Sequence, residues 1–273
     1  MEEVPIPADE VVPMDDIAVG VVGLSVLFTN VFAIIGEEGW VLVDAALYGS
    51  ATRIIDWARG HGPEEPPRAI LLTHAHFDHV GALDTLVKRW KAPVYAHIEE
   101  IPYVTGERAY PPPDPSVGGG LMARMAGLYP RQPIALDTVS PLPPDGSLPM
   151  LPGWQWIHTP GHTAGHVSFF RAADRTLIVG DAFCTTKAES FFAAVVTQKP
   201  ELHGPPAYFT TDWDAARESV QRLAALDPMF MAPGHGRAMS GEATRLALAR
   251  LAEHFDELAR PAHGRYVEHP TRG

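Results

Sequence analysis

The chain is almost free of cysteine, since Cys184 is the single one among 273 residues. A disulfide within the chain is therefore impossible, and the fold does not depend on an oxidising compartment. The first residues, MEEVPIPADEVVPMDD, are acidic and proline-rich. They lack the basic segment and apolar run of a secretory signal, so we expect a cytoplasmic protein.

An excess of positive charge and long apolar runs are also missing. The formal net charge is -12, whereas a protein that coats nucleic acid needs a basic face. The longest apolar run, IAVGVVGLSVLF, is too short and too glycine-broken to span a bilayer. We therefore expect no nucleic acid and no membrane as partners. A small-molecule substrate is expected, and a homodimer stays open.

The apolar pattern alternates between strands and helices. We expect strands within 17–44 and at 68–73, 92–96, 154–158, 166–170, 175–181 and 228–236. Helices are expected at 50–60, 80–90, 212–226 with Asp212 as cap, and 242–260. This alternation favours an α/β layered fold. We predict one domain over 1–273, with its core at about 17–236 and a C-terminal helix at about 242–260.

The most specific signal is THAHFDH, residues 73–79, which follows the apolar run AILL. Residues two apart on an extended chain point the same way, so His74 and His76 share one side. Asp78 and His79 open the next helix and can face a neighbouring point. The pattern supplies two imidazoles for one cation, and a carboxylate with an imidazole for another, as zinc and related divalent metals prefer.

Two histidines cannot complete a zinc site, so further ligands must come from elsewhere in the chain. Three small-residue turns follow other apolar strands, in TPGHTAGH (159–166), LIVGDAF (177–183) and MAPGHG (231–236). They offer His162, Asp181 and His235. Site residues of α/β folds commonly lie at such strand ends.

Together, THAHFDH, TPGHTAGH, GDAF and PGHG resemble the metallo-β-lactamase superfamily, and WVLVDAA (40–46) matches its usual first motif. The resemblance implies a four-layer αβ/βα sandwich with two metals in a cleft at one edge of the sheets. The metal ligands that it implies are His74, His76 and His162 for metal 1, Asp78, His79 and His235 for metal 2, and Asp181 as the bridge.

Such a site implies hydrolysis by a metal-bridged hydroxide. Zinc is the expected metal, and iron, manganese or cobalt would also fit the ligands. Asp78 is a candidate catalytic residue that orients the nucleophile or carries its proton. Asp44 is expected to orient a ligand histidine or to cap a turn, and His166 to support its loop. Cys184 should be a small buried residue. The remaining histidines fit no ligand spacing and are predicted to be surface or helix residues; they are His61, His97, His203, His254, His263 and His269.

Two irregular segments, 102–153 and 183–213, are candidates for a lid or for simple packing onto the sandwich. The residues expected to contact substrate are Tyr103, Met122, Met125, Phe183 and Phe209. Adaptable methionine and aromatic side chains suit an acyl or aryl group.

A carboxylic ester or lactone is the favoured substrate, with phosphotriester, phosphodiester or β-lactam hydrolysis as alternatives. A glutathione thioester is less expected, because GDAFCTTKAES lacks the glycine- and cysteine-rich stretch of glyoxalase II. A mononuclear iron dioxygenase is also less expected, because the second set of ligands is complete.

Overall fold

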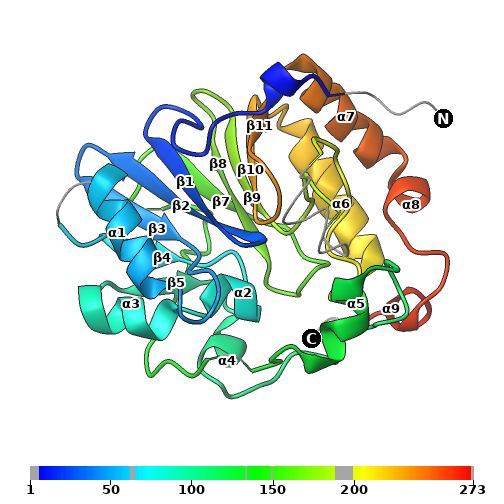
Figure 1. The fold of residues 1–273 in the computed structure, drawn as a ribbon, viewed down its shortest axis with the longest axis horizontal. Helices are drawn as coiled ribbons and strands as arrows, with labels where there is room; N and C mark the ends of the chain where they lie inside the picture. Colours follow the sequence, from blue (N-terminus) through cyan, green and yellow to red (C-terminus); the bar gives the residue numbers. More distant parts are fainter. Residues whose placement is uncertain (1–5, 62–64, 133, 149, 188–198, 272–273) are drawn as a thin grey trace.

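A computed structural model describes residues 6–61, 65–132, 134–148, 150–187 and 199–271. The strands form two sheets (Figure 1). The first runs in chain order through β1 (Val21–Val26), β2 (Thr29–Gly36), β3 (Gly39–Val43), β4 (Ala69–Leu71), β5 (Val94–Ala96) and β6 (Ser140–Pro141). The second has the order β11 (Met239–Ser240), β10 (Phe230–Pro233), β9 (Thr176–Gly180), β8 (Val167–Arg171) and β7 (Trp154–His158).

Both sheets are mixed. The hairpins β1–β2 and β2–β3 are antiparallel, whereas β3, β4, β5 and β6 pair in parallel. In the second sheet β9 and β10 are parallel and the other pairs are antiparallel. Parallel pairing places the carboxyl ends of neighbouring strands at the same edge of the sheet. The loops that follow these strands can form a site there.

Helices cover the outer face of each sheet. Figure 1 shows α1 (Ala51–His61) and α3 (Leu83–Trp90) against the first sheet, and α6 (Trp213–Ala225) and α7 (Glu242–Glu253) against the second. The shorter helices are η1 (Ala8–Glu10), α2 (Phe77–Val80), α4 (Ile101–Val104), α5 (Leu121–Met125), η2 (Ala126–Leu128), α8 (Phe255–Leu258) and α9 (Arg265–Glu268).

Alternation along the strands explains the layers. In β4, Ile70 joins the core under α1 and α3, whereas its neighbour Leu71 joins the core between the sheets. In β9, Leu177 packs on the α6 side and Ile178 packs between the sheets. Successive side chains point to opposite faces, so apolar strands with both faces buried require helices outside and a second sheet inside. The expected four-layer αβ/βα sandwich is confirmed.

Two helix predictions were wrong in detail. The helix expected at 242–260 is α7 followed by α8, because His254 leaves helical geometry at φ -113° and ψ 31°. The helix expected at 80–90 is α3 alone, preceded by α2, because Gly81 donates its N–H to Ala46 O and lies against the Leu47 backbone. The segment 102–153, expected to be irregular, contains α5, η2 and β6.

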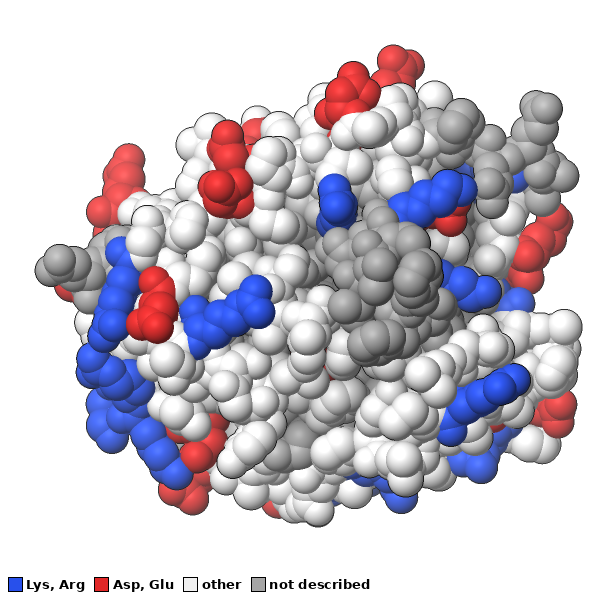
Figure 2. All heavy atoms as spheres, in the orientation of Figure 1, with Lys and Arg blue, Asp and Glu red and all other residues white. Residues whose placement is uncertain are grey.

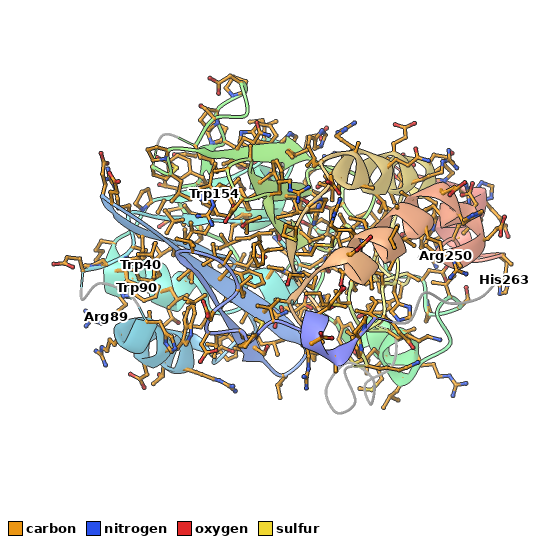
Figure 3. All side chains as sticks on the ribbon, turned by 90° about the horizontal axis from the view of Figure 1, so that it is seen from above. Trp40, Arg89, Trp90, Trp154, Arg250 and His263 are labelled. Atoms are coloured by element: carbon orange, nitrogen blue, oxygen red, sulfur yellow. The ribbon has the colours of Figure 1, made fainter. Side chains whose placement is uncertain are left out.

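The two ends of the molecule differ in character. Trp40 and Trp90 meet edge to face, with ring centroids 5.6 Å apart, at the end where α1 and α3 lie. Figure 3 shows Arg250 and His263 at the opposite end.

Within the described ranges, no helix combines the length and apolar character that crossing a bilayer requires.

Candidate metal centre

The candidate ligands lie at strand ends of both sheets. His74 and His76 follow β4, and the first turn of α2 carries Asp78 and His79. His162 lies in the loop between β7 and β8, Asp181 directly follows β9, and His235 follows β10. All seven side chains are buried. The fold therefore brings polar groups from five segments into a buried edge of the sandwich.

These side chains form three overlapping groups whose ligand atoms lie within 4.8 Å of one another. The groups are His74, His76 and His162; His74, His79 and Asp181; and Asp78, His79 and His235. The arrangement matches the two ligand sets expected from the sequence.

Asp181 lies centrally among these groups. Its Oδ2 is 3.1 Å from His235 Nε2 and 3.4 Å from His162 Nε2, and its Oδ1 is 3.4 Å from His79 Nε2. His76 Nδ1 and His162 Nε2 are 3.0 Å apart, and Asp78 Oδ2 is 3.5 Å from His235 Nε2. The carboxylate of Asp181 thus reaches both sets, as a bridging ligand must.

Unpaired polar atoms test whether metals fit here. Among the described residues, four buried side-chain nitrogen or oxygen atoms have no hydrogen-bond partner, and three belong to this centre: His74 Nε2, His79 Nε2 and Asp181 Oδ1. Burying such an atom unsatisfied costs about 1–3 kcal/mol. Imidazole nitrogen and carboxylate oxygen are ordinary ligands of zinc, so divalent cations would satisfy all three.

The neighbours of the histidines fix which nitrogen faces the centre. His79 Nδ1 lies 2.7 Å from Asp44 Oδ2, and that carboxylate also accepts from Thr73 N and Thr73 Oγ1. His235 Nδ1 donates to Phe28 O over 2.7 Å. Each Nδ1 therefore carries a hydrogen, and each Nε2 is the nitrogen that faces the centre. Asp44 was expected to orient a ligand histidine or to cap a turn, and the structure shows its contact with the candidate ligand His79.

With this geometry in place, known proteins can be compared. The family model of the metallo-beta-lactamase superfamily matches residues 24–235. The chain belongs to this superfamily. It is 45% identical over 246 residues to the probable metallo-hydrolase YflN of Bacillus subtilis (strain 168), a match covering 88% of this chain and 93% of that protein. Superfamily membership and this relative place the chain among the metallo-hydrolases.

Other members of the superfamily differ in chemistry. A hydroxyacylglutathione hydrolase of Xylella fastidiosa (strain M12) is 27% identical, over 83% of this chain and 64% of that enzyme. The crystal structure of TTHA1623 in a di-iron-bound form superposes with a TM-score of 0.53 at 29% identity, covering 85% of this chain and 96% of that one. The BLEG-1 B3 metallo-beta-lactamase superposes with a TM-score of 0.57 at 25% identity, over 86% and 96%.

Burial and charge set the protonation of the candidate ligands. Burial lowers the pKa of His74 and His76 well below the ordinary value, and that of His162 to about 4. Burial also opposes protonation of His235, but the Asp181 carboxylate outweighs it and raises the pKa of His235 to about 9. The first three imidazoles are neutral and ready to bind a cation, whereas His235 holds a proton that a metal must displace.

His166 supports Asp181 through the backbone. Its Nε2 accepts the Asp181 N–H over 2.8 Å, so its Nδ1 carries the hydrogen and points to Thr159. Burial lowers the pKa of His166 to about 3. The neutral ring is therefore a fixed acceptor at the end of β9. We expected His166 to support its own loop. The structure shows in addition that His166 contacts the backbone of Asp181, the central candidate ligand.

Glu100 is a site residue that the sequence reasoning missed. It is fully buried, and Oε1 accepts from Thr163 Oγ1 at 2.7 Å and Gly165 N at 3.0 Å. Oε2 accepts from Ala75 N at 3.0 Å and from the Tyr110 hydroxyl. One carboxylate thus joins the loop of His74 and His76 to the loop of His162. In the sequence, Glu100 is the second of two adjacent glutamates in IEE (98–100), and nothing there indicates that it joins the two loops.

A small cavity lies beside His76 and His162. Its other lining residues are Tyr103, Tyr110, Pro111, Thr163, Ala164, Phe209 and Thr211. Phe209 stacks on His76 with ring centroids 4.4 Å apart, and Tyr103 stacks on Tyr110 at 4.0 Å. The structure therefore brings two of the residues expected to contact substrate, Tyr103 and Phe209, next to the candidate ligands.

The other three expected contacts lie elsewhere. Met122 and Phe183 are buried in the core under α6 and α7, and the Met125 side chain is largely exposed. Met and Phe at these positions satisfy the apolar face of that core, which the sequence pattern cannot distinguish from a substrate pocket. Part of the second candidate lid, 188–198, lies outside the described residues. Cys184 is buried, as expected.

Proposed function

We propose that this chain hydrolyses a neutral carboxylic ester or lactone with two zinc ions. His74, His76 and His162 would hold one ion, Asp78, His79 and His235 the other, and Asp181 both. Bound divalent metals supply Lewis acidity and lower the pKa of water from 15.7 to about 7. The central position of Asp181 and the unpaired atoms around it support this assignment.

The residues that line the cavity are the basis on which we choose the substrate class. The described residues that line it are neutral or aromatic apart from the two histidines, and none is lysine or arginine. On the face in Figure 2, the largest group of Lys and Arg side chains lies along the edge near α1 and α3. An anionic phosphodiester would lack a cationic partner at the wall. The cavity itself holds about 10 Å³, room for about one water molecule, so an acyl or aryl group would pack against Tyr103 and Phe209 once these rings move apart.

Asp78 is the residue that we assign to proton transfer. Burial raises the pKa of its carboxyl above the usual value, which makes its carboxylate a stronger base. Its Oδ2 lies 3.5 Å from His235 Nε2, within the second ligand set. In this position it can accept a proton from the attacking water and deliver it to the leaving oxygen.

A substrate panel tests the proposal. Zinc-loaded protein would be assayed with p-nitrophenyl butyrate, a γ-lactone, bis(p-nitrophenyl) phosphate, nitrocefin and S-lactoylglutathione. We expect kcat/KM for the ester or lactone to exceed that of each other substrate by at least about tenfold, or about 1.4 kcal/mol in the barrier. A higher value for the phosphodiester or the β-lactam would overturn the substrate assignment.

Glutathione thioester hydrolysis is a second candidate, because a hydroxyacylglutathione hydrolase aligns with 83% of this chain. The same alignment covers only 64% of that enzyme, so about a third of the relative has no aligned counterpart here. S-lactoylglutathione in the panel decides between the two: it would be the best substrate of a thioesterase and a poor one of the proposed esterase.

A further inference from the structure

A second cluster of metal-binding side chains lies outside the centre described above. Glu99 follows His97 in the segment between β5 and α4, and His158 is the last residue of β7. These residues form a fourth group whose ligand atoms lie within 4.8 Å of one another. The cluster thus joins the edge of one sheet to the edge of the other.

The ligand atoms of the three side chains are spaced slightly wider than the ligands of one zinc ion. His97 Nδ1 and His158 Nε2 each lie 3.8 Å from Glu99 Oε2, which is beyond hydrogen-bond range. Two ligands of one tetrahedral zinc, each at about 2.0–2.2 Å from the ion, are roughly 3.3 Å apart. A closure of about half an ångström is therefore required, and the Glu99 side chain, 52% exposed, is free to supply much of it.

The protonation of His97 favours a cation. Burial, with a smaller contribution from His158, lowers the pKa of His97 to about 4. The imidazole is neutral near pH 7, and its Nδ1 must release only a long hydrogen bond of 3.4 Å from Glu99 N to offer its lone pair to an ion. Its ring stacks on His158 with centroids 4.3 Å apart and planes 13° from parallel, so both rings must turn modestly to share one ion.

We propose that His97, Glu99 and His158 form a third, peripheral divalent-cation site that binds zinc. Two imidazoles and one carboxylate are a known zinc ligand set that keeps a fourth position for water. The side chains are 12%, 52% and 36% exposed, so the ion enters from solvent. This site is separate from the seven ligands of the buried centre.

Filling the site has a consequence for the nearby loop. His158 Nε2 donates to Ala164 O over 2.8 Å, so it must release that hydrogen bond and move its proton to Nδ1 before it binds zinc. Ala164 lies two residues after His162. Zinc at the peripheral site therefore loosens the loop that carries a ligand of the buried centre.

Metal counting tests the site directly. The full chain would be stripped of metal, equilibrated with buffered free zinc, and analysed by mass spectrometry of the bound metal. We expect wild type to bind one more zinc than Glu99→Gln, whose affinity for that ion falls at least about tenfold. His97→Asn should lose the same ion. Circular dichroism would verify that both variants fold.

A matched control is Glu37→Gln, an exposed carboxylate in the turn between β2 and β3, which should keep the wild-type count. Equal zinc binding by wild type, Glu99→Gln and His97→Asn would overturn the proposal. So would loss of the extra ion in the control.

A second readout rests on the proposed hydrolysis, whereas the metal count does not. Raising free zinc should lower kcat/KM of wild type at least about twofold and leave Glu99→Gln unaffected, because the variant keeps the His158 contact with Ala164. Equal inhibition of both proteins would contradict the coupling to the His162 loop. An inactive protein that still shows the difference in zinc count would overturn the esterase assignment and support the peripheral site.

Discussion

At the scale of the residue, the centre depends on a few buried charges whose partners are all within reach. Asp181 is 2% exposed and contacts three histidines. Coulombic attraction from His235 and His79 outweighs burial and holds the pKa of Asp181 well below the usual value. Its carboxylate is therefore charged at neutral pH and ready to bind cations.

Replacing Asp181 should remove the link between the two ligand sets. We expect Asp181→Ala to bind fewer than two metals per chain and to lose more than about a hundredfold in kcat, beyond the effect of a residue that only orients a ligand. Bound-metal analysis and ester hydrolysis would measure both. The exposed Asp137→Ala serves as control. Unchanged metal content in Asp181→Ala would exclude it as the bridge.

Glu100 should affect zinc affinity although its carboxylate contacts no side chain of a candidate ligand. In Glu100→Gln, an amide NH₂ group would face the donors of one loop, leaving buried hydrogen bonds unmade at a cost of about 1–3 kcal/mol. We expect zinc affinity to fall about 10–100-fold. Competition with a chromophoric chelator would measure it, with the exposed Glu107→Gln as control. Wild-type affinity in Glu100→Gln would show that the two loops hold their places without this carboxylate.

Protonation of His235 should couple metal binding to pH. Because its pKa is about 9 without metal, zinc must displace a proton, and affinity should rise from about pH 6 to about pH 9. Against the effect of burial, the carboxylates of Asp181 and Asp44 also raise the pKa of His79 well above its usual value. Calorimetry in buffers of different ionisation enthalpy should therefore report at least one proton released. A constant affinity over this range would contradict the assignment.

The same shifts affect the stability of the metal-free fold. The raised pKa of His235 stabilises the fold fully below its ordinary value of 6.5, and this contribution is lost as the pH rises through about 9. The lowered pKa of His162, about 4, has the opposite sign. Its contribution is present above 6.5 and is lost as the pH falls towards 4.

At the scale of the element, the site depends on glycine turns that allow loops to approach one another closely. Gly161 has φ 132°, and a Cβ there would overlap the backbone of Ala216 in α6. Gly161 O also accepts from Thr211 N and Asp212 N, where Asp212 caps α6 by accepting from Ala215 N. The start of α6 and the loop of His162 therefore hold each other in place.

Gly161→Ala should break this contact. We expect a loss of at least about 2–3 kcal/mol in unfolding free energy, from left-handed strain and overlap together, and loss of one metal. Urea unfolding and metal analysis would show it. Gly49→Ala is the matched control, since Gly49 has φ 83° with open space around its Cβ position, so strain alone of about 1–2 kcal/mol applies. Equal losses in the two variants would argue against the contact with α6.

At the scale of the whole molecule, the centre joins the two sheets. His74 and His76 come from the first sheet, whereas Asp181 and His235 come from the second. A cation bound by both groups links the sheets across the interior, and a ligand that binds only the folded state stabilises it by mass action.

Removing metal should therefore lower the melting temperature. With free zinc at about 100 times Kd, the expected stabilisation is about 2.7 kcal/mol per independent site. Thermal unfolding with zinc, with a chelator, and with zinc restored would measure the difference. The same series on Asp181→Ala should show a smaller shift. An identical melting temperature in all conditions would contradict a role of metal in the fold.

The sequence alone predicted the fold class, which is confirmed, and the candidate ligands, whose side chains the structure brings together. THAHFDH and three glycine-turn histidine or aspartate motifs follow buried strands, and strand alternation with parallel pairing brings such ends together. These features depend on spacing of a few residues, which a sequence displays directly.

Only the tertiary structure decided the contacts between distant segments. Glu100 bonds to Gly165, 65 residues away, and His97 meets His158 across two sheets. All four of Met122, Phe183, Tyr103 and Phe209 belong to buried core clusters, but only Tyr103 and Phe209 also line the cavity. An apolar or acidic side chain looks the same in the sequence whether it faces a core, a ligand loop or a substrate, because its partner is set by packing and not by its neighbours in the chain.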